Sequence, residues 1–496
     1  MSQTKSNLFF MRQSLRLHIV IIGLFFTGSN FAQPASVQPP LPVFSIPSAA
    51  QMKWHKMEMN AFIHFSINTF TDKEWGYGNE SAQLFNPSAL NTEQWAKILK
   101  ETGFKTMILT TKHHDGFCLW PSKYSDHTIK NSPYKNGKGD LVKEASASSK
   151  KYGLHFGVYL SPWDRNRADY GTASYITYYR NQLKELFTQY GPIVEMWFDG
   201  ANGGDGYYGG ANEKRKIDGA TYYDWPNTIQ LVKSLQPNVI FFSDAGPGVR
   251  WVGNELGFVN ETNWNTISTD TLFAGKAGIE TLLGTGSPDG NQWVPAEVDV
   301  SIRPGWFWHE SENDQVKTPE QLFDIYLTSV GRGSTLLLNI PPDKRGLFHE
   351  NDIAALRGFK QILDREFAVN KALNATASAT EIRGGLKAFS AKHLTDGRED
   401  TYWTTNDDIT SADFTIDFEK PTPIQYIVLQ EYIQLGQRVK SFTAEVWKDN
   451  TWQKVDTGTT IGYKRILKIN PVNTSKIRIT IQDSKACPVI SNVEVY

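Results

Sequence analysis

Hydrophobic and polar positions follow one pattern over most of the chain. Short apolar runs alternate with longer segments whose apolar residues recur three and four positions apart. The runs are typical of buried parallel strands, and the longer segments are typical of amphipathic helices. The expected strands cover 61–67, 106–112, 155–161, 193–200, 239–245 and 334–340, and the expected helices cover 91–103, 140–153, 173–191, 227–236, 318–333 and 350–370. This alternation predicts an α/β fold, a (β/α)8-like barrel that is irregular between 260 and 325, where strands six and seven are not legible.

The pattern changes after the last of these helices. Short strands of alternating polarity follow one another, separated by Asn, Asp, Gly and Pro. They cover 412–418, 424–433, 441–448, 463–469 and 476–482. Such a series is typical of an all-β antiparallel sandwich. The sequence therefore predicts a barrel over 49–368 and a β-sandwich over 369–496.

The N-terminal residues have the order of a secretory signal peptide. Basic residues precede the apolar run IVIIGLFF, and small and polar residues then lead to Ala32. The run is too short to span a membrane. We expect a signal peptide over 1–32, a linker over 33–48, no membrane span, and export to a periplasm or to the outside. Cys118 and Cys487 are expected to be free thiols, since two cysteines make no disulfide framework.

Charge and aromatic content narrow the choice of partner. The chain has 51 basic and 52 acidic residues, a net charge of −1 and no basic run, which argues against nucleic acid as a partner. Aromatic residues make up 13% of the chain, and they can either fill large cores or stack on sugar rings. Nothing in the composition indicates an oligomeric state.

Polar side chains gather where the predicted strands end. His64, His113, His114, Asp164 and Asp199 all lie at or near the C-terminal end of a strand. Active sites of β/α barrels are built at that end. A cap or a turn accounts for any one of these residues, but the series favours a site. A metal-dependent hydrolase is the alternative, although adjacent residues of an extended strand point to opposite faces and no metal-binding motif accompanies the histidines.

A Gly-rich loop after the fifth predicted strand offers a partner for Asp199. The loop carries Arg250, Glu255 and Glu261. Two carboxylates on one rim suit glycoside hydrolysis, in which one acts as nucleophile or base and the other as acid. A solvated surface loop is the alternative for the two glutamates.

Five segments together resemble the α-L-fucosidases of glycoside hydrolase family 29. They are AFIHFSINTF, LTTKHHDGFCLW, VYLSPWDRN, MWFDGA and SIRPGWFWH, and the resemblance covers roughly residues 45–365. It implies a retaining mechanism without a cofactor, with fucosylated oligosaccharides or glycoconjugates as substrates. It also implies Asp199 as nucleophile, Glu255 as acid/base, and fucose surrounded by His64, His113, His114, Arg250 and Trp306.

The segments VYLSPWDRN and VRWVGNE resemble the subgroup that prefers α-1,3/1,4-linked fucose. A broader linkage specificity is the alternative, as is a non-catalytic glycan-binding protein with the same two domains. Glu74, Trp75 and Asp164 are candidates for contacts with the rest of the glycan, unless they lie on the surface away from it. Trp306 is either a wall for the sugar or part of the core.

The C-terminal part resembles the discoidin-like modules that include carbohydrate-binding family 32. The resemblance rests on LNATASATEIRGG, HLTDGREDTYWTT and LQEYIQLGQRVKSFTAEVW. Asp396 and Asp400 flank a turn that could hold a structural Ca²⁺ through oxygen ligands, and a plain turn with exposed acids is the alternative.

Overall fold

The structure is a computed structural model, and it describes residues 37–496. The signal peptide expected over 1–32 lies outside the described residues. Residues 40–496 form one compact unit.

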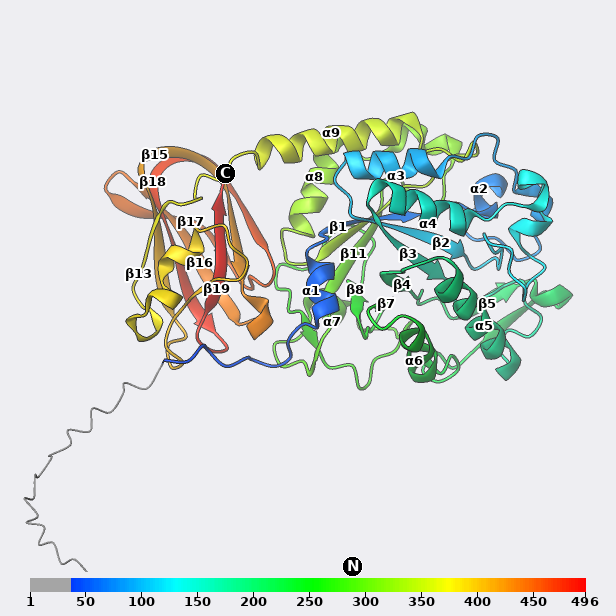
Figure 1. Cartoon of the computed structure of the whole chain (residues 1–496), viewed down its shortest axis with the longest axis horizontal. Coiled ribbons are helices and arrows are strands. Elements are labelled where there is room, and N and C mark those ends of the chain that lie inside the picture. Colours follow the sequence, from blue (N-terminus) through cyan, green and yellow to red (C-terminus); the bar gives the residue numbers. More distant parts are fainter. Residues whose placement is uncertain (1–36) are drawn as a thin grey trace, which may run out of the picture. The chain divides into compact units, whose positions relative to one another are not determined.

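Eight parallel strands close into a barrel, as shown in Figure 1. The order around the barrel is β1-β12-β11-β8-β7-β4-β3-β2. The strands are β1 (Met59–Ile63), β2 (Thr106–Lys112), β3 (His155–Leu160), β4 (Glu195–Trp197), β7 (Ile240–Ser243), β8 (Val249–Trp251), β11 (Ala296–Ser301) and β12 (Thr335–Asn339). Two small antiparallel sheets of two strands interrupt the series: β5 (Gly203–Gly206) pairs with β6 (Glu213–Lys216), and β9 (Thr266–Ile267) pairs with β10 (Gln292–Trp293).

The six expected helices are present within a few residues of their expected bounds. The six are α3 (Thr92–Glu101), α4 (Leu141–Tyr152), α5 (Ala173–Gln189), α6 (Trp225–Leu235), α8 (Pro319–Thr328) and α9 (Glu350–Glu366). The described residues also form the short helices α1 (Ala49–His55), α2 (Ile67–Thr71) and α7 (Glu280–Thr285). Side-chain caps explain several of the starts. Asn91 and Asp140 accept hydrogen bonds from free backbone amides of α3 and α4, and Thr318 begins α8 with a capping box.

The sixth and seventh barrel strands are β8 and β11. β8 has three residues, which is too few for a visible alternation, and it lies inside the stretch that the sequence suggested was a loop. β11 runs from Ala296 to Ser301 and keeps Glu297 and Asp299 buried among apolar neighbours, so it does not read as an apolar run. Of these two strands, only β11 lies between 260 and 325, where both were expected, whereas β8 precedes that region.

Aromatic side chains fill the inside of the barrel. Phe62, Tyr159, Trp197 and Phe242 come from four different strands and are buried together. Trp197 stacks on Phe242 with ring centroids 3.9 Å apart. A packed interior of this kind supports the residues at the strand ends.

The C-terminal part is an antiparallel β domain. Its strands are β13 (Thr376–Ala379), β14 (Trp403–Thr404), β15 (Ala412–Glu431), β16 (Val439–Lys448), β17 (Thr451–Gly458), β18 (Arg465–Ser484) and β19 (Val489–Val495). Two expected strands, 412–418 and 424–433, are one long strand with a register shift between Asp417 and Thr422. The domain has its own apolar core, which includes Trp403. The expected fold class, a (β/α)8-like barrel followed by an antiparallel β domain, is confirmed.

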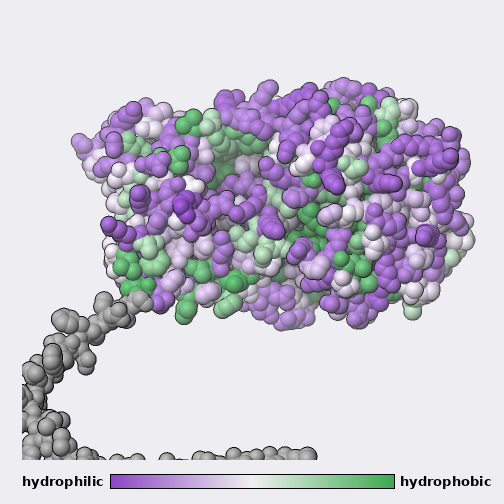
Figure 2. Space-filling view, in the orientation of Figure 1, coloured by the Kyte–Doolittle hydropathy of each residue, from purple (hydrophilic) through white to green (hydrophobic). Residues whose placement is uncertain are grey.

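The surface shown in Figure 2 is largely hydrophilic, with hydrophobic residues confined to scattered patches. Over residues 37–496, every helix is too short or too polar to cross a bilayer.

Candidate active site

Asp199 follows β4, where the barrel interior ends. Its Oδ2 accepts a hydrogen bond of 3.0 Å from the Tyr159 hydroxyl, and its Oδ1 accepts one of 2.7 Å from the amide of Ala201. The side chain remains 23% exposed. A Cβ atom at Gly200 would lie 2.8 Å from Cγ of Asp244, so the glycine makes room for this second acid. The carboxylate is therefore fixed in orientation and accessible.

Three histidines from two strand ends form a cluster that reaches Asp199 through His114. His64 Nδ1 is 2.8 Å from Oδ1 of Asn339, and His114 Nδ1 is 2.7 Å from the Ser161 hydroxyl. His114 Nε2 lies 3.8 Å from Oδ2 of Asp199. The His113 ring lies near both, with ring centroids 5.8 Å from His64 and 4.1 Å from His114.

The rings of His113 and His114 lie on the same side of the chain, in contrast to the expectation for a strand. The reason is that β2 ends at Lys112, so the two histidines belong to the turn that follows it. Their neighbouring positions in the sequence therefore do not place the two rings on opposite faces.

Burial keeps these histidines neutral. It lowers the pKa of His64 to about 3 and the pKa of His113 well below its ordinary value. Burial also lowers the pKa of His114, against the opposing effect of the Asp199 charge. Neutral imidazoles offer one donor and one acceptor each, which suits the hydroxyl groups of an uncharged sugar.

Glu255 lies in a tight turn after β8. Gly253 and Gly257 on either side have φ of 83° and 88°, which favours glycine, and the amide of Leu256 donates to Oδ1 of Asn254 at 3.0 Å. Oε2 of Glu255 accepts a hydrogen bond of 3.0 Å from the Trp306 indole. Burial raises the pKa of Glu255, and the charges of Asp199 and Glu74 raise it further, against the lowering effect of the indole hydrogen bond.

Glu261 has different surroundings. Both glutamates have exposed side chains, but the backbone carbonyl of Glu261 accepts hydrogen bonds from Thr459 and Arg465 of the β domain. Its charge acts on Arg332, Arg465 and Asp456. Of the two loop glutamates, Glu255 is the one whose charge environment includes Asp199.

Trp306 and Trp75 provide aromatic surface at the site. The Trp306 ring lies 5.2 Å from the ring of His64, and Glu74 accepts hydrogen bonds from the amides of Trp306 and Phe307 at 2.8 and 3.1 Å. Trp75 is 55% exposed and stands edge-on to His114, with ring centroids 5.2 Å apart. Glu74 thus supports the Trp306 loop, while Trp75 borders the site itself.

Arg250 does not fit the expected contact with the sugar. It lies in β8, is fully buried, and its guanidinium donates to the carbonyls of Leu283, Trp264 and Val294 and to Oδ1 of Asn263. The sequence suggested a loop at this position, and a loop arginine would be free to reach a ligand. In the short strand, the guanidinium instead holds neighbouring backbone segments together.

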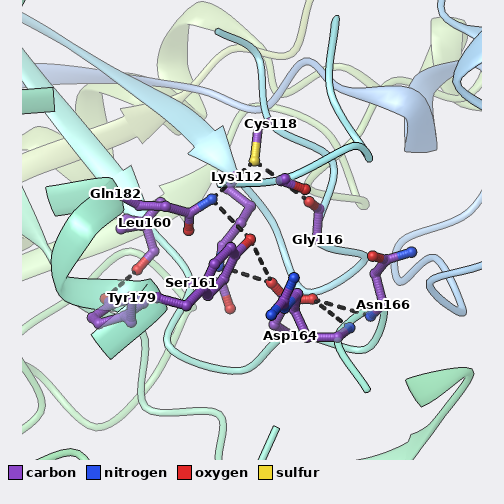
Figure 3. Close-up of polar contacts among 12 residues, drawn as sticks. Lys112, Gly116, Cys118, Leu160, Ser161, Asp164, Asn166, Tyr179 and Gln182 are labelled. Atoms are coloured by element: carbon purple, nitrogen blue, oxygen red, sulfur yellow. Dashed lines mark hydrogen bonds and ion pairs between the residues drawn. The ribbon is translucent and has the colours of Figure 1, made fainter. Parts of the chain in front are cut away.

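Asp164 is likewise a structural residue instead of a glycan contact. Figure 3 shows Lys112 and Asp164 pointing toward each other from β2 and from the turn after β3. Lys112 Nζ lies 3.0 Å from Oδ2 of Asp164, and both side chains are fully buried. Oδ1 accepts hydrogen bonds of 3.1 Å from the amides of Asn166 and Arg167. This pair therefore fixes the turn behind His114.

Three residues of the site were not found from the sequence. Tyr159, which donates to Asp199, is one of several aromatic residues in a buried strand and has no distinguishing signal. Asp299 is buried in β11, and burial together with the Glu255 charge raises its pKa well above the ordinary value. Asn339 ends β12 after an apolar run, and the strand-end rule that identified Asp199 applies equally to it.

Asp396 and Asp400 each make hydrogen bonds within their own turn. All four carboxylate oxygens accept hydrogen bonds: those of Asp396 from His393, Thr401 and the amide of Arg398, and those of Asp400 from the Arg398 guanidinium. These contacts favour the plain turn, and the calcium site stays a prediction. Across residues 37–496, no group of three or more His, Cys, Asp or Glu side chains is arranged to hold a metal ion.

A parallel barrel whose strand ends carry a fixed carboxylate, a second carboxyl group of raised pKa, neutral histidines and exposed tryptophan defines a carbohydrate-active hydrolase. The sequence model of the family described as Alpha-L-fucosidase matches residues 41–366, and that of the F5/8 type C domain matches residues 374–495. The chain belongs to the α-L-fucosidases of glycoside hydrolase family 29, and it carries a C-terminal discoidin-like domain.

Similar proteins occur in plants and bacteria. Alpha-L-fucosidase 1 of Arabidopsis thaliana is 40% identical, with 92% of this chain and 88% of that protein aligned. The crystal structure of a glycoside hydrolase 29 family member from an unknown rumen bacterium has a TM-score of 0.82 at 44% identity, covering 92% of this chain and 78% of that chain. A Ruminococcus gnavus GH29 fucosidase, solved in complex with fucose, has a TM-score of 0.83 at 34% identity, covering 92% and 96%.

Proposed function

We propose that the protein is an exo-acting, retaining α-L-fucosidase in which Asp199 is the nucleophile and Glu255 is the acid/base. Asp199 attacks the anomeric carbon while Glu255 donates its proton to the leaving oxygen, which gives a covalent β-fucosyl-enzyme. Glu255 then removes a proton from water as the water displaces Asp199, and α-L-fucose leaves. Both groups end in the states in which they began.

The observation that carries this proposal is the environment of Glu255. A general acid must hold a proton near neutral pH, and burial together with the charges of Asp199 and Glu74 raises the pKa of Glu255 in that direction. Asp199 is held by two donors, Tyr159 and the amide of Ala201, which orient it for attack. Double displacement requires one ionised carboxylate as nucleophile and one protonated carboxyl group as acid.

Fucose would lie among His64, His113, His114 and Trp306, with Trp75 at the border. Neutral histidines bind sugar hydroxyls, and indole rings pack against the apolar face and the methyl group of fucose. The Ruminococcus gnavus relative, solved with fucose, supports this choice of sugar.

The preferred linkages are α-1,3 and α-1,4 on branched glycans. The subgroup resemblance of VYLSPWDRN and VRWVGNE supports them. Trp75 is 55% exposed, and Leu256, next to Glu255, is 72% exposed. These two side chains offer apolar surface to a branched leaving group. A fucosidase of broader specificity is the second candidate.

Proton NMR of the reaction tests the mechanism and the linkage together. With Lewis-type trisaccharides and with α-1,2- and α-1,6-linked fucosides as substrates, we expect α-L-fucose as the first anomer and the highest kcat/KM for α-1,3/1,4 linkages. Initial release of β-L-fucose would refute retention. Equal kcat/KM for all linkages would favour the broader specificity.

The enzyme is exported, with its mature chain beginning after Ala32. The order of basic, apolar and small residues before this position supports the assignment. N-terminal sequencing of the protein from its native cell fraction tests it, and an intact Met1 in a cytoplasmic fraction would refute it.

A further inference from the structure

His309 belongs to the loop that carries Trp306, and its ring lies between the carboxylates of Asp72 and Glu74. Its Nδ1 is 2.7 Å from Oδ1 of Asp72, and its Nε2 is 2.7 Å from Oε1 of Glu74. An ionised carboxylate can only accept a hydrogen bond, whereas a neutral imidazole has one donor nitrogen and one acceptor nitrogen. Both contacts are hydrogen bonds only if both ring nitrogens carry protons, which makes His309 an imidazolium.

The Glu74 carboxylate joins His309 to the backbone of the site. Its Oε2 accepts from the amide of Trp306, and its Oε1 accepts from the amide of Phe307 as well as from His309. Packing at this point is tight, since a Cβ atom at Gly305 would lie 2.6 Å from Oε1 of Glu74 and 3.0 Å from Cδ2 of His309. The interaction connects the loop of Trp306 to the segment that ends in Trp75.

This connection extends to the proposed acid/base. The Trp306 indole donates to Glu255, and the charge of Glu74 is one of the factors that raise the pKa of Glu255. An imidazolium beside Glu74 partly offsets that charge, which acts against the raised pKa of Glu255, but it also holds the backbone that orients the indole. Loss of the His309 proton would release this backbone, and the expected loss of activity comes from that release.

Acidic groups dominate the surroundings of His309. Asp72 follows α2, Glu74 follows in the same segment, and Glu312 lies in the short helix Glu310–Gln315. Lys73 is directed to Glu80, with Nζ 3.7 Å from Oε1 of that residue. Burial lowers the pKa of His309, but the hydrogen bonds to Asp72 and Glu74 and the charges of Glu74 and Glu312 raise it above its ordinary value.

We propose that His309 is a positioning residue whose protonated form clamps the Trp306 loop to the Trp75 segment, and that full fucosidase activity requires this clamp. The kinetic consequence rests on the proposed role of Glu255, whereas the protonation of His309 does not. A histidine of raised pKa stabilises the clamped state fully below its unfolded value, about 6.5, and the stabilisation is lost as the pH rises through the folded value. The clamp therefore contributes to the alkaline limb of the pH profile.

Asp72→Asn tests the clamp without touching the Trp306 loop. Asp72 is 64% exposed, so its substitution should not impair folding, and it leaves the contacts of Glu74 in place. Asp396→Asn is the matched control, because Asp396 contacts His393 in the β domain at 3.0 Å. The His309 resonance is identified in spectra of protein carrying ¹³Cε1-histidine as the signal lost in His309→Gln.

We expect His309 to titrate above the ordinary histidine value and Asp72→Asn to lower its pKa. The alkaline limb of the kcat/KM profile on an aryl fucoside should move to lower pH by the same number of pH units. At a fixed pH on this limb, kcat/KM should then fall about tenfold for each unit of the shift. Activity well below the ordinary histidine pKa should be retained, and Asp396→Asn should leave the profile unchanged. Titration of His309 at or below its ordinary value, or a limb that stays fixed while the resonance shifts, would overturn the clamp. Loss of the leaving-group dependence expected of Glu255 would refute the proposed function instead, and it would leave the titration result standing.

Discussion

Replacement of Glu255 by alanine separates the two steps of the proposed reaction. The substitution removes a carboxyl group whose one hydrogen-bond donor, among the contacts described, is the Trp306 indole. Its neighbours Asp199, Glu74 and Asp299 are acidic. Loss of a carboxyl group from such surroundings should not destabilise the fold, so the melting temperature of Glu255→Ala should equal or exceed that of the wild type.

The expected kinetic loss depends on the leaving group. General acid catalysis contributes about 10²- to 10⁴-fold to rate, which is about 2.7 to 5.4 kcal/mol of transition-state stabilisation. A sugar hydroxyl needs the proton to depart, so Glu255→Ala should lose this full factor on a fucosylated trisaccharide. An aryl fucoside with an acidic phenol needs little assistance, so its first step should be nearly unaffected.

Azide makes the result specific to the acid/base. A small anion can enter the space left by the carboxyl group and displace Asp199 from the β-fucosyl-enzyme, which gives α-fucosyl azide. In Asp199→Ala, azide would instead attack the substrate directly and give β-fucosyl azide. Proton NMR distinguishes the two products.

Glu261→Ala is the matched control, because Glu261 belongs to the same loop region and is exposed. It should behave as the wild type on both substrates. The assignment of Glu255 is refuted if Glu255→Ala cleaves the trisaccharide normally while Glu261→Ala shows azide rescue.

Three further results are expected. Asp164→Asn should destabilise the fold by roughly 3 to 5 kcal/mol in urea unfolding, because it leaves the Lys112 ammonium buried without its counterion; a loss below about 1 kcal/mol would contradict the account of this pair. Arg250→Met should also destabilise by roughly 3 to 5 kcal/mol, since four acceptors lose their donor, while KM for an aryl fucoside stays within about twofold; a stable variant with a much higher KM would return Arg250 to the sugar site. EDTA should change neither turnover nor melting temperature, because the oxygens of Asp396 and Asp400 already accept hydrogen bonds, and a melting temperature that falls and is restored by Ca²⁺ would contradict this.

The sequence was informative wherever a local pattern determines the structure. Asp199 was identified because an apolar run that ends in an acid is visible without a partner, and the barrel architecture then gives that position its meaning. The helices were predicted because their caps and apolar spacing are local properties. Six of the eight barrel strands are long or apolar enough to be recognised from the sequence pattern.

Asp164 and Asp199 look alike in the sequence, since each follows an aromatic residue at or just after the end of a predicted strand. They differ in what faces them: Asp164 pairs with Lys112 in a buried site, whereas Asp199 is partly exposed beside His114. Only the packing of β2 against β3 places that lysine there. The distinction between a structural and a candidate catalytic acid was therefore not available from the sequence.

Other parts of the site depend on distant contacts. His309 and Glu74 are separated by 235 positions, and no local pattern connects them. Arg250 was assigned to a loop because β8 is only three residues long, and the strand brings its guanidinium to backbone carbonyls of later segments. Short strands and long-range polar contacts set the limit of sequence reasoning in this fold.

Trapping of the covalent intermediate tests the central claim most directly. A 2-deoxy-2-fluoro-fucosyl fluoride slows both steps but carries a good leaving group, so the fucosyl-enzyme should accumulate. Intact-mass spectrometry should then show one added sugar, and peptide sequencing should place it on Asp199, with no label on Asp199→Asn. A label on any other residue, or inactivation without a covalent adduct, would contradict the account.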